Sequence, residues 1–145
     1  MCYTLLLSTS SDEDLALHNN DLVRFSRDLP SIAAADHLKY AHRWYVGSQA
    51  GCSCTFRHSM EQNGLGFQEP VEWWKEEPQP IDATLQLIAI IRGLLASGHT
   101  VDCVDVFGDL KVPGPDRELE VDLSTVSNAA FRFFENYHFV FMSTG

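Results

Sequence analysis

The sequence predicts one α+β domain over residues 1–145, a two-layer sandwich in which two main helices cover a mixed or antiparallel sheet. The chain is 45% hydrophobic, which suffices for a sizeable core at this length. One long stretch has helical periodicity, and several shorter apolar runs are typical of strands. From residue 51 onward the predicted order is strand, helix, strand, strand, helix, strand. This order is that of the ferredoxin-like split pattern.

The first elements are short. Residues 2–8 are apolar enough for a buried strand, and residues 10–20 predict a short helix with Ser and Asp capping signals and a closing Asn pair. Residues 22–26 and 37–47 predict two further strands. In the second of these, one face is expected to carry Leu38, Tyr40, His42, Trp44 and Val46.

The strongest helical signal lies in residues 81–98. Apolar residues recur there at the spacing of an amphipathic helix: Ile81, Leu85, Ile88, Ile91 and Leu95, widened by Leu87, Ile90 and Leu94. Pro80 suits the first turn of this helix. Gly98 suits the left-handed position just after its end. We therefore expect a core helix with both ends defined by the sequence.

The last third predicts three strands and the second main helix. Residues 101–107 alternate with apolar residues on both faces, and residues 119–124 predict another strand. Residues 124–136 predict a helix that Asn136 ends in the left-handed conformation. Residues 137–142 predict a strand with aromatic residues on one face.

The charge of the chain is unevenly distributed. The formal net charge is −10, with five basic and six acidic residues in 1–60 but five basic and fourteen acidic in 61–145. Nucleic acids and anionic lipid surfaces need basic partners, so we expect neither to bind. Acidity promotes solubility, and it also suits docking of a basic protein.

The location of the protein is predicted from its first residues and its cysteines. Residues 1–14 have no basic region and too short an apolar run for a signal peptide, and residues 85–96 are too short to span a bilayer. We therefore expect a cytoplasmic protein whose four cysteines are reduced.

The segment GCSCTFRH, residues 51–58, is a candidate site. In an extended strand, Cys52, Cys54, Phe56 and His58 share one face. Two thiolates and an imidazole suit zinc, although the paired knuckle of a structural zinc site is missing. Thiol chemistry would require a lowered cysteine pKa. The third interpretation is a buried strand in which the cysteines are small core residues. No cofactor is predicted, and zinc is the alternative.

The segment around Trp73 and Trp74 is the second candidate, because exposed tryptophans beside acidic residues such as Glu76 can dock sugars, peptides or cationic ligands. Packing of a loop onto the core is the competing interpretation. Adjacent residues cannot share one face, so at least one indole is expected to be partly exposed.

Several acidic residues in the last third predict a solvated sheet face rather than a metal site, because their spacing does not fit a calcium-binding loop: Asp102, Asp105, Glu118, Glu120 and Asp122. No catalytic motif is recognised. The leading hypothesis is a non-catalytic binding or regulatory protein whose surface of Trp73, Trp74 and Glu76 engages a basic protein or small cationic ligand. The alternative is a thiol- or metal-dependent enzyme or sensor that uses Cys52, Cys54 and His58.

Overall fold

A six-stranded sheet forms the body of the molecule. The structure, a computed structural model, describes residues 2–30, 32–48, 52–59, 67–108 and 115–144. The strands follow the order β2-β3-β1-β5-β8-β6 across the sheet. Their bounds are β1 Cys2–Thr9, β2 Arg24–Ser26, β3 His42–Gly47, β5 Val101–Gly108, β6 Arg117–Asp122 and β8 Tyr137–Met142. A separate parallel pair consists of β4 His58–Ser59 and β7 Phe133–Phe134.

The sheet is mixed, which is one of the two alternatives, mixed or antiparallel, that the sequence predicts. β6 runs parallel to β8, whereas the other neighbouring strands are antiparallel. β1 and β5 occupy the middle, where both faces are covered, and this position explains why their sequences are apolar on both sides. Leu5, Leu6 and Leu7 are all fully buried. Central strands buried on two faces lose the simple apolar–polar alternation of a half-exposed strand.

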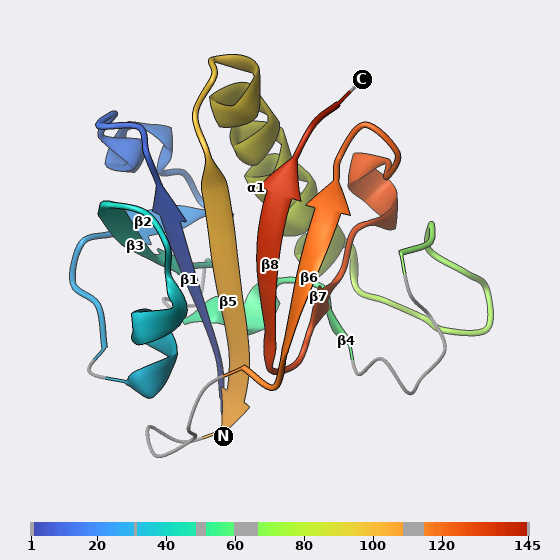
Figure 1. Ribbon diagram of the computed structural model, residues 1–145. Helices are drawn as coiled ribbons and strands as arrows, with labels where there is room; N and C mark the ends of the chain where they lie inside the picture. Colours follow the sequence, from blue (N-terminus) through green and yellow to red (C-terminus); the bar gives the residue numbers. More distant parts are fainter. Residues whose placement is uncertain (1, 31, 49–51, 60–66, 109–114, 145) are drawn as a thin grey trace.

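Within the described residues the one α-helix is α1, Pro78–Ala96, which Figure 1 shows lying across one face of the sheet behind β5 and β8. The apolar stripe predicted from the sequence is the buried side of this helix and includes Leu87, Ile88 and Ile91. Pro80 lies in the first turn, and Gly98 has φ 88°, the left-handed conformation expected after the helix end. The prediction of a core helix here is confirmed.

Both faces of the sheet are covered. The larger core lies between the sheet and α1 and includes Leu5, Leu7, Val101 and Cys103. A smaller cluster on the opposite face packs the segment around the 3₁₀-helix η2, Ala33–His37, against Leu6 and Val104. The α+β class is therefore confirmed, whereas the two-layer arrangement is not, because the irregular cover on the second face has no periodic pattern in the sequence.

The prediction of a second main helix is wrong. The residues predicted as a helix over 124–136 contain only the 3₁₀-helix η5, Asn128–Ala130, followed by β7. Phe131, Phe133 and Phe134 all point into the core, which an amphipathic helix of this length would not allow. Without that helix the ferredoxin-like order is not confirmed.

The N-terminal predictions are confirmed in part. The helix over 10–20 is reduced to the 3₁₀-helix η1, Leu15–His18, and the strand over 22–26 is β2. Of the residues predicted as a strand over 37–47, only His42–Gly47 form a strand, β3. Leu38 belongs to the smaller core cluster while Trp44 and Val46 belong to the larger one, so the predicted shared face is wrong. Within the described residues, no helix is long and apolar enough to cross a bilayer.

Candidate functional site

Residues 67–77, here called the Trp loop, precede α1 and project at the right of Figure 1 in yellow-green. Trp73 is 70% exposed and Trp74 is 37% exposed, and their rings meet edge to face with centroids 6.5 Å apart. Among the described residues, the other large hydrophobic side chain that stands exposed is Leu17. The two indoles therefore offer aromatic area to a partner at one place on the surface.

A buried ion pair fixes the end of the Trp loop. Nε and Nη2 of Arg57 donate to the two carboxylate oxygens of Glu76, at 2.7 and 2.8 Å. The side chain of Arg57 is 1% exposed and that of Glu76 is 11% exposed. Nη1 of Arg57 also donates to the backbone carbonyls of Ala129 and Phe131. All three nitrogens of this guanidinium thus have acceptors.

A second arginine completes the cluster and reaches the start of the Trp loop. Nη2 of Arg132 donates to Oε1 of Glu76 at 3.0 Å, and Nη1 donates to the carbonyl of Gln68 at 2.6 Å. Its side chain is also almost fully buried. Because Gln68 and Glu76 lie near opposite ends of the loop, one buried cation holds both ends. We call Arg57, Glu76 and Arg132 the loop anchor.

The anchor keeps its carboxylate ionised. Burial alone would raise the pKa of Glu76, but the hydrogen bonds and positive charges of Arg57 and Arg132 outweigh burial and lower that pKa. Burial lowers the pKa of Arg132, and the nearby Glu76 opposes this effect. A largely buried carboxylate between two buried guanidinium groups is strongly tied to both, since its removal leaves two buried positive charges without a counter-charge.

Two further contacts hold the loop. The ring of Phe67 stacks between those of Phe131 and Phe134, with centroid separations of 5.1 and 5.0 Å. The hydroxyl of Ser127 donates to Glu69 at 2.7 Å. The loop is therefore fixed to the core by aromatic packing and charge, while its tryptophans face solvent.

The surroundings of the indoles are acidic. Glu69, Glu72 and Glu77 are exposed on or beside the Trp loop, against the single exposed cation Lys75. The carboxylate of Glu76 is neutralised by the anchor. Three exposed carboxylates and two indole faces form a surface suited to a cationic group, because both carboxylates and aromatic faces attract cations.

The anchoring contacts of Arg57 and Arg132 were not predicted from the sequence. Each arginine follows a phenylalanine that the structure buries, in the segments TFRH and FRFF. An arginine inside a buried aromatic run needs a carboxylate partner, so this pattern was an available signal. It could not identify Glu76 as the partner, which lies 19 and 56 positions away.

The second candidate segment differs from its predicted form. Residues 53–55 form the 3₁₀-helix η3, Ser53–Thr55, and only His58–Ser59 pair as a strand. The predicted extended strand with four side chains on one face is therefore wrong. Ser53 is buried and Cys54 is exposed. The buried hydroxyl of Ser53 explains this local shape, since it donates to the carbonyl of Val46 at 2.6 Å and accepts from the Leu5 amide at 3.0 Å.

The side chain of His58 is buried and lies against Asp105 of β5. Its Nδ1 is 2.8 Å from Oδ2 of Asp105, and its Nε2 is 2.6 Å from the carbonyl of Ser53. The ring of Tyr3 stacks on it with centroids 3.7 Å apart, and the Tyr3 hydroxyl donates to Glu135 at 2.5 Å. Burial raises the pKa of Asp105, and His58 opposes that rise. Burial, followed by the bond to Glu135, raises the pKa of Tyr3.

The cysteines and His58 are not assembled as a ligand set in the part of the chain that the structure describes. Both ring nitrogens of His58 have partners, so neither is directed at a thiol. Cys103 is the fully buried cysteine, and burial raises the pKa of its thiol. Across residues 2–144, outside the gaps given above, no group of three His, Cys, Asp or Glu side chains has a geometry that could hold a metal ion.

The prediction of a solvated carboxylate face is wrong for Asp102 and Asp105. Asp102 and Asp105 are fully buried and belong to opposite faces of β5. The Asp102 carboxylate accepts hydrogen bonds from the Ser8 hydroxyl and the Lys39 amide, and it lies 2.7 Å from Nε2 of His138. Their odd spacing of three along a strand places them on different sides, each against its own histidine.

Comparison with known proteins gives no match: no family model, no curated protein and no solved structure matches this chain.

Proposed function

We propose that the protein is a non-catalytic binding protein that engages a basic segment of a protein partner through the Trp loop. One observation carries this proposal: two exposed indoles, Trp73 and Trp74, stand on a loop whose ends are held by a buried anchor. Exposed tryptophan is unusual on a surface that contacts only water, whereas tryptophan is enriched at protein interfaces.

The chemistry of the surface favours lysine and arginine side chains. A cation over an indole face gains about 0.5–1 kcal/mol at an exposed site. The exposed carboxylates of Glu69, Glu72 and Glu77 also attract cations and speed the encounter with a basic segment. The occupant that fits both features is a short Lys- and Arg-rich peptide of another protein.

The anchor has a positioning role in this proposal. Trp73 and Trp74 contact the partner, and Glu76 fixes the loop on which they stand. A loop already held in one conformation loses less conformational entropy on binding than a free one, and this difference appears as affinity.

Isothermal titration at low salt with an array of basic peptides, each matched by a peptide in which Glu replaces Lys and Arg, tests the proposal. We expect basic peptides to bind and their acidic counterparts not to bind. Trp73→Ala and Trp74→Ala should each weaken binding roughly ten-fold, as for hot-spot residues. Leu17→Ala, which removes an exposed hydrophobic residue elsewhere, is the control and should leave affinity unchanged.

Two results would overturn the proposal. One is that no basic peptide of the array binds at low salt. The other is that binding occurs with equal affinity in Trp73→Ala, Trp74→Ala and the unmodified chain.

A second candidate function is a thiol- or metal-dependent enzyme or sensor that uses Cys52, Cys54 and His58; the exposure of Cys54 favours its thiol form, whereas its metal form would need His58 to leave the partners described above. Elemental analysis of protein purified without chelator distinguishes its two forms. Zinc that is lost in a Cys52→Ser, Cys54→Ser variant supports the metal form. Metal-free protein whose thermal stability does not change in excess zinc excludes that form.

A further inference from the structure

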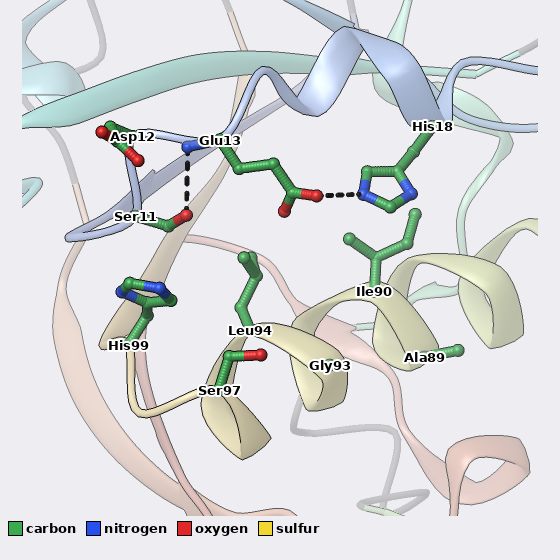
Figure 2. Close-up of a pocket in the computed structure, with 10 residues that line it drawn as sticks. All are labelled: Ser11, Asp12, Glu13, His18, Ala89, Ile90, Gly93, Leu94, Ser97 and His99. Carbon is green, nitrogen blue, oxygen red and sulfur yellow. Dashed lines mark hydrogen bonds and ion pairs between the residues drawn. The ribbon is translucent and has the colours of Figure 1, made fainter.

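A cavity of about 580 Å³ lies between residues 11–18 and the C-terminal half of α1, at the other end of the helix from the Trp loop (Figure 2). This volume is within the usual range of small-molecule sites. It is lined by Ser11, Asp12, Glu13, His18, Ala89, Ile90, Gly93, Leu94, Ser97 and His99.

The wall of this cavity is tied to the body of the protein at both ends. Ser10 and Thr100 exchange two hydrogen bonds, from the Ser10 amide to the Thr100 carbonyl at 3.2 Å and from the Thr100 amide to Oγ of Ser10 at 2.9 Å. At the other end, the Asn20 amide group donates to Oε1 of Gln86 on α1 at 2.6 Å. Between these ties, Leu15 is fully buried in the core. The cavity is therefore framed by fixed contacts.

The floor of the cavity is apolar and includes a glycine. Ile90 and Leu94 point upward from α1 into the cavity in Figure 2, beside Gly93. A Cβ placed at Gly93 would meet no atom within 4 Å, so packing does not explain a glycine there. Glycine is the poorest helix former after proline. Its effect at this position is to keep the floor of the cavity open.

The opposite wall carries hydrogen-bond acceptors and negative charge. Ser11 is 3% exposed, and its Oγ accepts from the Glu13 amide at 3.1 Å. The carboxylates of Asp12 and Glu13 flank it (Figure 2). Oε1 of Glu13 is 3.5 Å from Nε2 of His18, and no partner is recorded for Oε2 within the described residues. The nearby C-terminal end of α1 adds negative potential.

We propose that this cavity binds a small aliphatic primary amine in its ammonium form. The alkyl chain lies on Ile90 and Leu94 above Gly93, and the ammonium group donates to the carboxylates of Asp12 and Glu13. The charge of the wall selects a cation, and the apolar floor selects an alkyl body. This site is separate from the Trp loop and does not depend on the function proposed for that loop.

Amide chemical shifts of the isotope-labelled full chain at pH 8, where an ordinary histidine is neutral, test the proposal. The probe is n-hexylamine, compared with n-hexanol and hexanoate. We expect n-hexylamine to give saturable shifts at the amides of Ser11, Glu13, Gly93 and Ser97. Asp12→Asn and Glu13→Gln should each weaken binding about two- to five-fold, as for single exposed charge pairs.

Gly93→Leu adds a side chain into the cavity and should abolish binding. Ala96→Leu, an exposed position of α1 that does not line the cavity, is the matched control and should bind normally. Trp73→Ala should also leave the response at Gly93 unchanged, which separates this site from the Trp loop. The proposal is overturned if no saturable shift appears, if Gly93→Leu binds as the unmodified chain does, or if hexanol or hexanoate binds equally well.

Discussion

Arg57 and Glu76 form a two-point ion pair inside the molecule, with hydrogen bonds of 2.7 and 2.8 Å between a guanidinium and both oxygens of a carboxylate. Because Arg132 shares the same carboxylate, one acidic residue of the Trp loop contacts two buried cations, and Arg132 also binds the carbonyl of Gln68. The stability of the fold and the display of the indoles are therefore coupled at Glu76.

Glu76→Gln should destabilise the protein by about 3 kcal/mol, because it leaves two buried guanidinium groups without a counter-charge. Urea unfolding followed by circular dichroism measures this loss. Glu77→Gln, a neighbouring exposed residue, is the control and should leave the midpoint unchanged. Equal midpoints for Glu76→Gln and the unmodified chain would show that the anchor does not stabilise the fold.

The anchor also predicts a dependence of stability on pH. The pKa of Glu76 is lowered in the folded protein, so the unfolded chain binds a proton at this residue more readily than the folded chain. The stabilisation is therefore present above the ordinary glutamate pKa of about 4.3 and is lost as the pH falls through the lower, folded value. Free energies of unfolding measured between pH 6 and pH 3 should show a smaller acid-induced loss in Glu76→Gln.

The contribution of Asp105 to stability changes with pH in the opposite direction to that of Glu76. Burial raises the pKa of Asp105, so its contribution to stability is present below the ordinary aspartate pKa and is lost as the pH rises through the folded value. In Asp105→Asn this loss on raising the pH should disappear. If Asp105→Asn and Glu76→Gln changed the pH profile with the same sign, the assigned role of one of them would be wrong.

Asp102 should be the more important structural carboxylate of β5. It is fully buried. Its carboxylate accepts hydrogen bonds from the Ser8 hydroxyl and the Lys39 amide, and it lies 2.7 Å from Nε2 of His138. Asp102→Ala leaves these groups without their acceptor and should cost about 3 kcal/mol or more in thermal or urea unfolding. Glu120→Ala on the exposed side of β6 should change stability by less than about 0.5 kcal/mol.

The cysteines should differ in reactivity. Cys54 is exposed, whereas Cys103 is fully buried and burial raises the pKa of its thiol. Because the thiolate reacts and must be accessible, iodoacetamide at pH 7 should label Cys54 well before Cys103 in the native protein. Mass spectrometry of digested samples over time measures both rates. In urea the difference should disappear, and its persistence there would contradict a cause in the fold.

Local periodicity predicted the elements whose apolar residues recur at the regular spacing of a helix or a strand. The stripe of α1, the strand Val101–Gly108 and the strand Tyr137–Met142 all follow from the spacing of apolar residues. The same reasoning failed at Cys52 and Cys54, because alternating small residues do not distinguish a strand from a turn fixed by the buried hydroxyl of Ser53.

The candidate site was predicted only in part, because several of its contacts join residues that are distant in sequence. Exposure of at least one of Trp73 and Trp74 follows from their adjacency, since neighbouring residues cannot share one buried face, whereas the structure exposes both. The inward direction of Glu76 comes from Arg57 and Arg132, which are distant in sequence. The cavity beside Gly93 likewise needs two segments brought together by the sheet, and no local pattern contains that information.

The pairing of β1 with β5 has a consequence for how the chain folds. These central strands lie about a hundred residues apart in the sequence, with Leu5 opposite Asp105. Because ribosomes add residues from the N-terminus, Leu5, Leu6 and Leu7 leave the ribosome shortly before their partner strand β3 but long before β5, their partner on the other side. Long-range pairing of this kind slows folding, and an apolar strand without its partner is prone to associate with other chains. Efficient production of the protein in cells should therefore depend on chaperones that cover β1 until β5 emerges.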